Sequence, residues 1–365
     1  MATNKYDNQL NKKLISLKKS LDRSEKRISA IVNDFLSKPE VNKAYWNKVN
    51  IKLNKEYRKV KVITDKWASV EIPKQYRFVI KEQMSKAKSL KSVTYKAKAT
   101  TSKLLKSNKS TGIQSALAQS AIQDMTSGLL QGRNDINRLI SATKQTLISE
   151  SQIDKSLMTS IQQGDISLSK VLSRRGTVAN KLLKANDGNR FIKIIDKNGN
   201  PRRYRISYYA EMVYRSKWHD AQSEAVKTVN ANYDTDLVRV SSHNTTTVIC
   251  QQYEGKVFSL TGKNKDFPIL DQAPGFHVNC LHYINTTFEE ALKVQGIYDQ
   301  YSDFSQGKTN TPPGRNGFVP IKERNKIADS TIVATKKTDK YKKATPKQKR
   351  NILRNNVSTA IGKAA

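Results

Sequence analysis

Apolar residues in the first hundred positions recur at intervals of three and four, which places them on one side of a helix. The first stripe consists of Leu10, Leu14, Leu17, Leu21, Ile28, Ile31 and Phe35. We expect Pro39 to end this helix. Residues 45–61 and 76–91 continue the pattern, and Pro73 between them predicts a break between two helices. The pattern therefore predicts helices that pack along one side and expose charge on the others.

A second helical region follows. Residues 101–112 are rich in Ser, Thr, Lys and Gly, which is typical of a linker or loop. Helical spacing resumes at Ile113 and continues to Ile148, and Gly128 and Gly132 indicate helix ends or bends within it. Asp-Gly and Asn-Gly pairs in residues 186–203 then predict a β-hairpin.

The next hundred residues contain both helical and strand-like patterns of apolar residues. Residues 207–233 carry a helical apolar face, whereas residues 236–240 and 256–260 have the character of strands. From Gly307 onward the chain is poor in apolar residues and rich in lysine, which predicts a flexible tail. The expected fold is a mainly α N-terminal region of long basic helices, then a small α+β module, then a flexible basic C-terminal tail. The expected divisions are 1–110, 111–200, 201–300 and 301–365.

The charge is the strongest compositional signal. The 365 residues include 66 Lys and Arg against 31 Asp and Glu, a formal net charge of +35. Such a surplus predicts a polyanionic partner, and its spread along the chain favours double-stranded DNA over a membrane surface. For any single lysine, a solvated helix face is the alternative. The candidate DNA contacts are Lys12, Lys13, Lys18, Lys19, Lys26, Arg27, Lys336, Lys337, Lys342, Lys343, Lys349 and Arg350.

Other classes of protein are disfavoured. No apolar run approaches the ~20 residues that span a bilayer, so no membrane partner is expected. Two cysteines cannot form a disulfide framework, which fits synthesis in a reducing host cytoplasm.

The cysteines and several histidines lie close together in the sequence. Cys250, His277, Cys280 and His282 would provide a Cys2His2 set, and thiolate and imidazole are preferred ligands of zinc. A C-x-x-C pair, the usual signature of such a site, is missing. Two interpretations therefore stay open: a structural zinc ion, or two buried thiols with histidines that bind no metal.

We expect a protein without enzymatic activity. Walker A, GxSxG, HExxH and GxGxxG motifs are missing from the sequence. The alternative is a metal-dependent DNA-processing nuclease that uses His277 and Cys280. The residues downstream offer Glu289, Glu290 and Asp299 as further ligands but no histidine. A thiol nucleophile has no recognisable oxyanion-hole loop to support it.

An ordered series of motifs in residues 203–284 resembles one protein family. The series reads RYRISYYAEMVYR, DLVRVSSH, CQQYEGKVFSLTG, DFPIL and APGFHVNCLH. It is similar to the minor capsid protein 2 family of tailed bacteriophages, which is related to Mu F-type head morphogenesis proteins. That family typically has a C-P-x-C segment where this chain has Thr247 and Cys250, so one expected ligand is replaced. His277, Cys280 and His282 match, whereas Val278 and Leu281 replace the usual Pro and Arg.

The resemblance implies a low-copy structural protein of the phage head, located in the capsid interior of the virion near the portal. It implies portal and head proteins as partners, a role in head assembly, and release with the genome on delivery. Binding to packaged DNA without sequence preference agrees with the basic composition. An internal scaffold that works by protein contacts alone is the remaining alternative.

Overall fold

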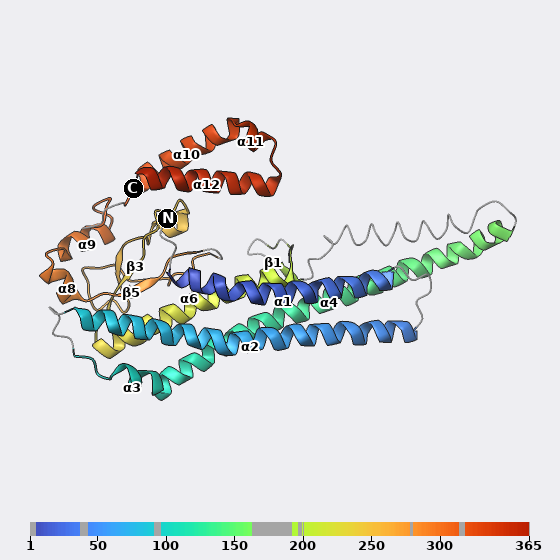
Figure 1. Ribbon diagram of the computed structural model, residues 1–365, viewed down its shortest axis with the longest axis horizontal. Coiled ribbons are helices and arrows are strands. Elements are labelled where there is room, and N and C mark those ends of the chain that lie inside the picture. Colours follow the sequence, from blue (N-terminus) through green and yellow to red (C-terminus); the bar gives the residue numbers. More distant parts are fainter. Residues whose placement is uncertain are drawn as a thin grey trace. The chain divides into compact units, whose positions relative to one another are not determined.

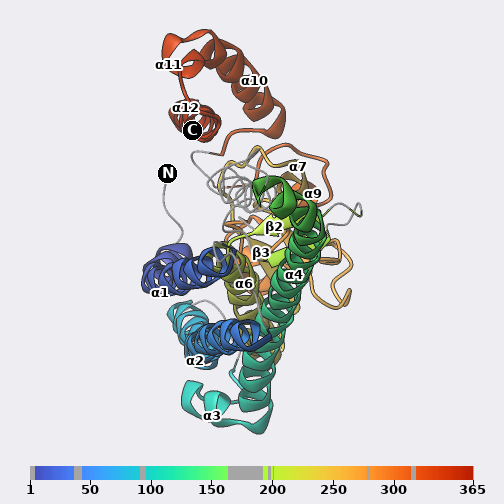
Figure 2. The same ribbon diagram turned by 90° about the vertical axis from the view of Figure 1, so that its right-hand side faces the viewer.

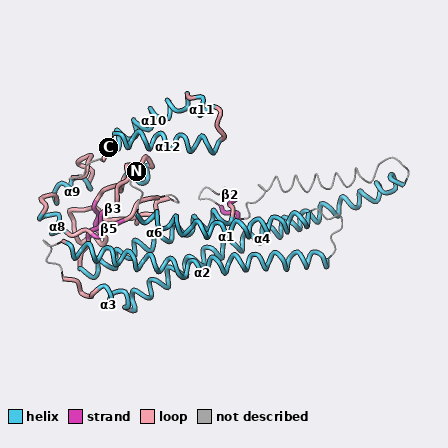
Figure 3. Tube along the Cα trace, in the orientation of Figure 1, coloured by secondary structure: helices cyan, strands magenta, loops and turns pink. Residues whose placement is uncertain are grey.

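The computed structural model describes residues 5–36, 43–90, 96–162, 192–195, 199, 201–277, 280–313 and 318–364, and most of them are helical (Figure 1). Within these residues, strands occur in two places, a hairpin and a small sheet (Figure 3). The chain forms two compact units, each assembled from separate segments. One contains Gln9–Glu71 and Ala118–Tyr214, and the other contains Met1–Asn8, Ile72–Leu117 and Arg215–Ala365.

Two long antiparallel helices begin the first of these units. Helix α1 (Lys5–Leu36) buries the predicted stripe with one change, because Val32 rather than Ile31 is fully buried. Helix α2 (Lys43–Ser89) buries Val49, Leu53 and Val60 in the part that belongs to this unit. Their polar sides are joined by ion pairs, with Lys13 bound to Glu71 and Arg27 bound to Glu56. The expected pairing of amphipathic helices is confirmed here.

Helix α2 corrects the expected break at Pro73, which lies inside the helix. A proline removes one backbone hydrogen bond and disfavours a helix interior by about 3 kcal/mol. The residues on either side compensate, because Ile72 and Tyr76 are fully buried. The Tyr76 hydroxyl also forms a hydrogen bond of 2.8 Å with Thr228 of α6 (Ile206–Tyr233). Packing therefore outweighs the local preference.

The expected linker at 101–112 is wrong as well. Helix α3 (Thr101–Lys106) occupies half of it, and helix α4 (Asn108–Gln162) begins within it. Thr100 caps α3, accepting a hydrogen bond from the amide of Lys103. Ser107 performs the same role for α4 by accepting from the amide of Ser110 at 3.2 Å. Serine and threonine are favoured both in loops and as helix caps, so composition alone misassigned them.

Gly128 and Gly132 do not end α4. A Cβ atom at Gly128 would lie 2.2 Å from the ring of Tyr209, so the missing side chain is what lets that ring reach the helix. The Tyr209 hydroxyl donates to the carbonyl of Asp124 at 2.9 Å. Gly128 is therefore a position where the Tyr209 ring packs directly against the backbone of α4. The side chains of the later predicted stripe, including Leu139 and Ile148, lie outside the described residues.

The hairpin and the start of α6 complete this unit. Strands β1 (Ile192–Ile195) and β2 (Pro201–Tyr204) pair antiparallel, as predicted, with Gly199 at a positive φ of 79° in the connection. The fully buried carboxylate of Glu25 accepts a hydrogen bond of 3.0 Å from the Ile206 amide and one of 3.0 Å from Arg205. The Glu25 carboxylate on α1 thus accepts a hydrogen bond from a backbone amide in the first turn of α6, which has no partner within the helix.

The other unit contains the small α+β module. Its sheet has the order β4-β3-β5, with all neighbours antiparallel; the strands are β3 (Leu237–Val240), β4 (Val257–Ser259) and β5 (Ile284–Thr286). The two strands expected from the sequence are confirmed, and β5 was not predicted. The apolar cluster beside the sheet consists of Leu237, Val257, Phe267, Leu292 and Tyr301, the last two on α8 (Glu289–Val294) and α9 (Tyr298–Ser305).

The end of the chain is helical, where the sequence predicts a flexible tail. Helices α10 (Ile321–Lys337), α11 (Asp339–Lys342) and α12 (Pro346–Ala364) form a hairpin, with α10 and α12 side by side in both views (Figures 1 and 2). Thr338 caps α11, and Asn356 of α12 donates to Thr335 of α10 at 3.0 Å. Ala328 and Ile361 supply buried apolar contacts. The basic composition stands, but the flexibility inferred from it does not.

Candidate functional site

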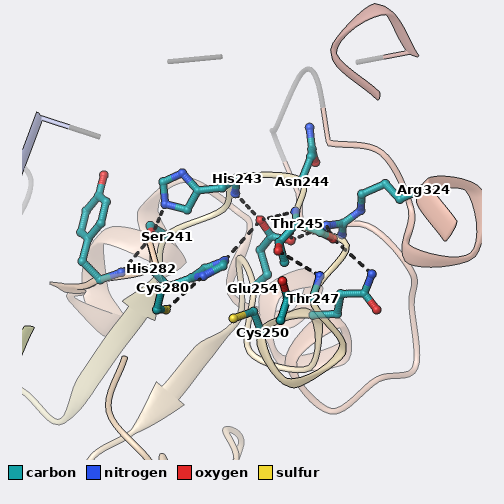
Figure 4. A network of polar contacts seen from close by, with 12 residues as sticks. Ser241, His243, Asn244, Thr245, Thr247, Cys250, Glu254, Cys280, His282 and Arg324 are labelled. Atoms are coloured by element: carbon teal, nitrogen blue, oxygen red, sulfur yellow. Dashed lines mark hydrogen bonds and ion pairs between the residues drawn. The ribbon is translucent and has the colours of Figure 1, made fainter. Parts of the chain in front are cut away.

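Three of the residues named from the sequence, Cys250, Cys280 and His282, lie close together in the α+β module (Figure 4). Cys250 lies on the short helix α7 (Val248–Gln251), and Cys280 and His282 lie just before β5. The sulfur of Cys280 is 3.6 Å from Nδ1 of His282, and the sulfur of Cys250 is 3.1 Å from Nε2 of His277. Ligand atoms of Cys250, Cys280 and His282 all lie within 4.8 Å of one another. The structure therefore brings three of the four predicted side chains into one group, and the fourth, His277, contacts Cys250.

The two thiols differ in their electrostatic environment. A hydrogen bond from Cys250 lowers the pKa of the Cys280 thiol, and this effect, together with the neighbouring His282, outweighs the burial that would raise it. The same interaction raises the pKa of Cys250, and burial adds to the increase. The pKa of the Cys280 thiol therefore lies below the ordinary value of a cysteine, and that of Cys250 lies above it. Both side chains are at most 2% exposed.

The buried carboxylate of Glu254 contacts the cluster through His282. Nε2 of His282 lies 3.4 Å from Glu254, whose side chain is fully buried. Burial would lower the pKa of His282, but Cys280 and Glu254 together raise it to about 9. Burial would likewise raise the pKa of Glu254, but the hydrogen bond with His282 and the charge of Arg324 lower it to about 2. His282 is therefore oriented with Nε2 toward a carboxylate and Nδ1 toward the sulfur.

Glu254 is also the centre of a polar network that reaches helix α10. It forms a buried ion pair with Arg324, and it accepts hydrogen bonds from the backbone amides of His243 and Thr245. Arg324 donates a second bond of 2.8 Å to the carbonyl of Thr245 and lies over the ring of Phe318. One carboxylate thus joins the 243–245 loop, the cysteine–histidine cluster and the C-terminal hairpin (Figure 4).

The other two histidines, His219 and His243, make different contacts. Nε2 of His243 is 2.8 Å from the hydroxyl of Ser241, and its ring packs edge-on against His282 at 5.0 Å between centroids. Burial lowers the pKa of His219, which packs beside Gly275. The geometry therefore favours His277 and His282 over these two histidines as partners of the sulfur atoms.

The donor set fits zinc. Two sulfurs and two imidazoles are a standard tetrahedral combination for zinc. A zinc-binding histidine ordinarily donates its other nitrogen to a carboxylate, which is the position of Glu254 beside His282. Thr247, where the family has its additional cysteine, is exposed at the start of α7. Four donors remain without it.

The acidic residues considered for a nuclease lie on other elements. Glu289 and Glu290 are on α8 and Asp299 is on α9, and Glu289 is paired with Lys293 at 2.6 Å. Among the described residues, the cysteine–histidine cluster is the only group of three or more potential metal ligands, and no carboxylate is part of it. The geometry thus adds no support to the nuclease interpretation.

The candidate DNA contacts on α1 divide into two sets. Lys13, Lys18 and Arg27 form ion pairs with Glu71, Glu211 and Glu56. Lys12, Lys19 and Lys26 are exposed and have no acidic partner among the residues that the structure describes. Their seven-residue spacing places them on one face at intervals of about 10 Å. Only this second set forms an uncompensated cationic row.

The candidates near the C-terminus lie on the helical hairpin. Lys336, Lys337, Lys343 and Arg350 are exposed, Lys342 lies 4.0 Å from Asp339, and Lys349 packs over the ring of Tyr341. These cations are carried by folded elements rather than by a loose segment.

Glu254 and Arg324 are functional-site residues that the sequence did not reveal. Glu254 stands beside Gly255, which has a φ of +78°, so Glu-Gly is typical of a turn before a strand. Arg324 lies in a segment interpreted as a basic tail. A lone arginine in a basic segment gives no sign in the sequence that its side chain is buried.

Comparisons with known proteins identify one family. Residues 39–352 match the family described as phage minor capsid protein 2. No curated protein and no solved structure shows significant similarity to the chain. The matched segment begins after α1 and includes α2, α4, the α+β module and most of the C-terminal hairpin. Within the described residues, no helix has the length and apolar character needed to cross a membrane.

Proposed function

The chain belongs to the phage minor capsid protein 2 family, which makes it a structural component of the phage head, and from this we propose that it lies inside the head near the portal and contacts the packaged genome. The observation that carries the DNA contact is the row of Lys12, Lys19 and Lys26 on α1. These ammonium groups are exposed and lack acidic partners in the described part of the chain, so an external anion is the natural counter-charge.

The proposed binding mode is contact with the phosphate backbone. Lysines at intervals of about 10 Å along a straight helix can each approach a phosphate, and each contact releases counterions from DNA. Base edges carry the sequence information, and reading them requires side chains that enter a groove. The row on α1 is a set of flexible point charges, which suits contact without sequence preference. The exposed cations of the α10–α12 hairpin supply a second surface of the same kind.

The α+β module is the proposed attachment point to the portal or to other head proteins. Its helix α7 exposes Val248, at 79%, and Ile249, at 39%, directly beside the buried Cys250. A rigid support beneath an exposed apolar tip is suited to docking, because little conformational entropy is lost on binding. Support for head assembly, and departure with the genome, belong to the same proposal.

A structural zinc ion held by Cys250, His277, Cys280 and His282 is part of this proposal. Bound zinc would cross-link the loop before β5 to α7. The residues of the chain prepare this geometry themselves: Glu254 orients His282, and Arg324 fixes Glu254.

Chemical cross-linking of intact heads tests the location. Purified particles are treated with external protease and nuclease, then cross-linked with formaldehyde, and the genome is isolated under denaturing conditions. The proposal expects the chain to resist protease and to co-purify with the DNA. A lysine-reactive cross-linker should also link residues 204–284 to the portal. Digestion of the chain in heads that keep their DNA intact would contradict an interior location.

A further inference from the structure

A groove opens between α1 and the first part of α2, within the unit that contains Gln9–Glu71. Its volume is about 710 Å³. Its lining includes Arg27 from α1 and Ile51, Lys55, Arg58, Val62 and Ile63 from α2. No acidic side chain is found among the described residues that line it. The groove is thus lined by both apolar and cationic side chains.

One helix face provides most of this surface. Ile51, Lys55, Arg58 and Val62 follow one another at intervals of four, three and four residues, so they share one stripe of α2 about 16 Å long. Ile51 is 67% exposed and Val62 is 66% exposed. The stripe therefore has an exposed apolar residue at each end and two cations between them.

The charge in the groove is uncompensated by the protein itself. Glu56, on the neighbouring face of α2, is neutralised by Arg27 at 2.8 Å and by Lys59 at 2.6 Å. Those contacts leave Lys55 and Arg58 without an acidic partner among the described residues. An occupant of the groove would therefore need two negative charges at its centre and apolar groups at its ends.

We propose that this groove binds an acidic amphipathic helix of another head protein. A helix lying along α2 can present apolar, acidic, acidic and apolar side chains at the same four-three-four spacing. Its carboxylates would pair with Lys55 and Arg58, and its apolar ends would cover Ile51 and Val62. A DNA backbone would satisfy the cations but would gain nothing from the two exposed apolar side chains, whereas their burial favours a protein partner. This interaction goes beyond the DNA contacts proposed for α1 and α10–α12.

Fluorescence anisotropy with a defined probe tests the proposal. The probe is a labelled helical peptide with Leu, Glu, Glu and Leu at the four-three-four spacing, and its control is a peptide of the same composition in scrambled order. The full-length chain should bind the probe and not the scrambled peptide. The double variant I51S/V62S should weaken binding by at least about tenfold, because two apolar contacts are lost. V70S, a change of an exposed apolar residue on α2 outside the groove, is the matched control and should bind as the unmodified chain does.

The second part of the experiment reverses the charges of the groove and of the probe. The variant K55E/R58E should lose the acidic probe and gain binding to a probe in which Lys replaces both Glu residues. The I51S/V62S variant should bind duplex DNA as the unmodified chain does, so a failure of this proposal is separable from a failure of DNA binding. Equal binding of the scrambled peptide, no effect of I51S/V62S, or no rescue by the lysine probe would overturn the proposal. A matching loss of DNA affinity in I51S/V62S would instead assign the groove to nucleic acid.

Discussion

The carboxylate of Glu254 and the guanidinium of Arg324 form an ion pair in which neither side chain is exposed to solvent. The two residues are 70 positions apart in the sequence. Their contact joins the cysteine–histidine cluster of the α+β module to helix α10. A buried charge that loses its partner is costly, so each residue constrains the other.

Replacing Arg324 by Met should destabilise the module by about 3–5 kcal/mol, because the buried carboxylate of Glu254 then loses its arginine partner. Urea unfolding of the full-length chain measures the change. K326M, at an exposed position on the same helix, should stay within about 0.5 kcal/mol of the unmodified chain. The double variant E254Q/R324M should recover part of the loss, because the unpaired charge is gone. A loss of the same size in K326M would show that the effect belongs to the helix rather than to the pair.

Asp236 predicts how stability depends on pH. Burial would raise its pKa, but hydrogen bonds from Ser259, Thr261 and the amide of Asn264 lower it below the ordinary value. A carboxyl whose pKa is lowered by folding stabilises the protein above the unfolded pKa of about 3.9 and loses that contribution as the pH falls further.

Urea unfolding between neutral pH and about pH 3 should therefore show a decline in stability that is steeper for the unmodified chain than for D236N. At neutral pH, D236N should be less stable by about 1–3 kcal/mol, and the two curves should converge in acid. D329N, on the exposed side of α10, should follow the unmodified chain. Parallel curves for D236N and the unmodified chain would remove Asp236 as the cause.

The zinc proposal predicts a single metal ion per chain, bound through two thiolates. Cobalt substitution should give the absorption bands of thiolate-to-metal charge transfer in a tetrahedral site. C280S and H282A should lose most of the metal, and H277A should weaken its binding. H243A should retain it, because Nε2 of His243 lies against Ser241 rather than against the sulfurs. Equal metal loss in H243A would assign the ligands differently, and a chain that remains metal-free in excess zinc would refute the site.

Features that depend on local periodicity could be predicted from the sequence. The buried side of α1 and the helix from Ile206 to Tyr233 follow directly from apolar spacing. The failures share a physical cause, because tertiary contacts override local preference. Pro73 stays inside α2 since Ile72 and Tyr76 are buried, and residues beyond Gly307 fold because α10 and α12 cover each other.

The candidate site was predictable in part for the same reason. Thiol and imidazole groups are rare in this chain, so their grouping pointed to Cys250, His277, Cys280 and His282 before any geometry was known. Glu254 and Arg324 are common residue types, and only the fold shows that they are buried together. The net charge of the chain likewise could not show that Lys13 forms an ion pair with Glu71, whereas Lys12 has no acidic partner among the described residues.

The dependence of duplex DNA affinity on salt concentration tests the central claim most directly. Affinity should fall steeply with rising salt and differ little between DNA sequences, since each phosphate contact contributes about −0.9 to the slope of log K against log salt. K12Q/K19Q/K26Q should make that slope shallower, whereas K13Q/K18Q/R27Q, which removes the paired set, should change it far less. A flat salt response of the unmodified chain, or an equal effect of the two triple variants, would contradict DNA binding through the exposed row of α1.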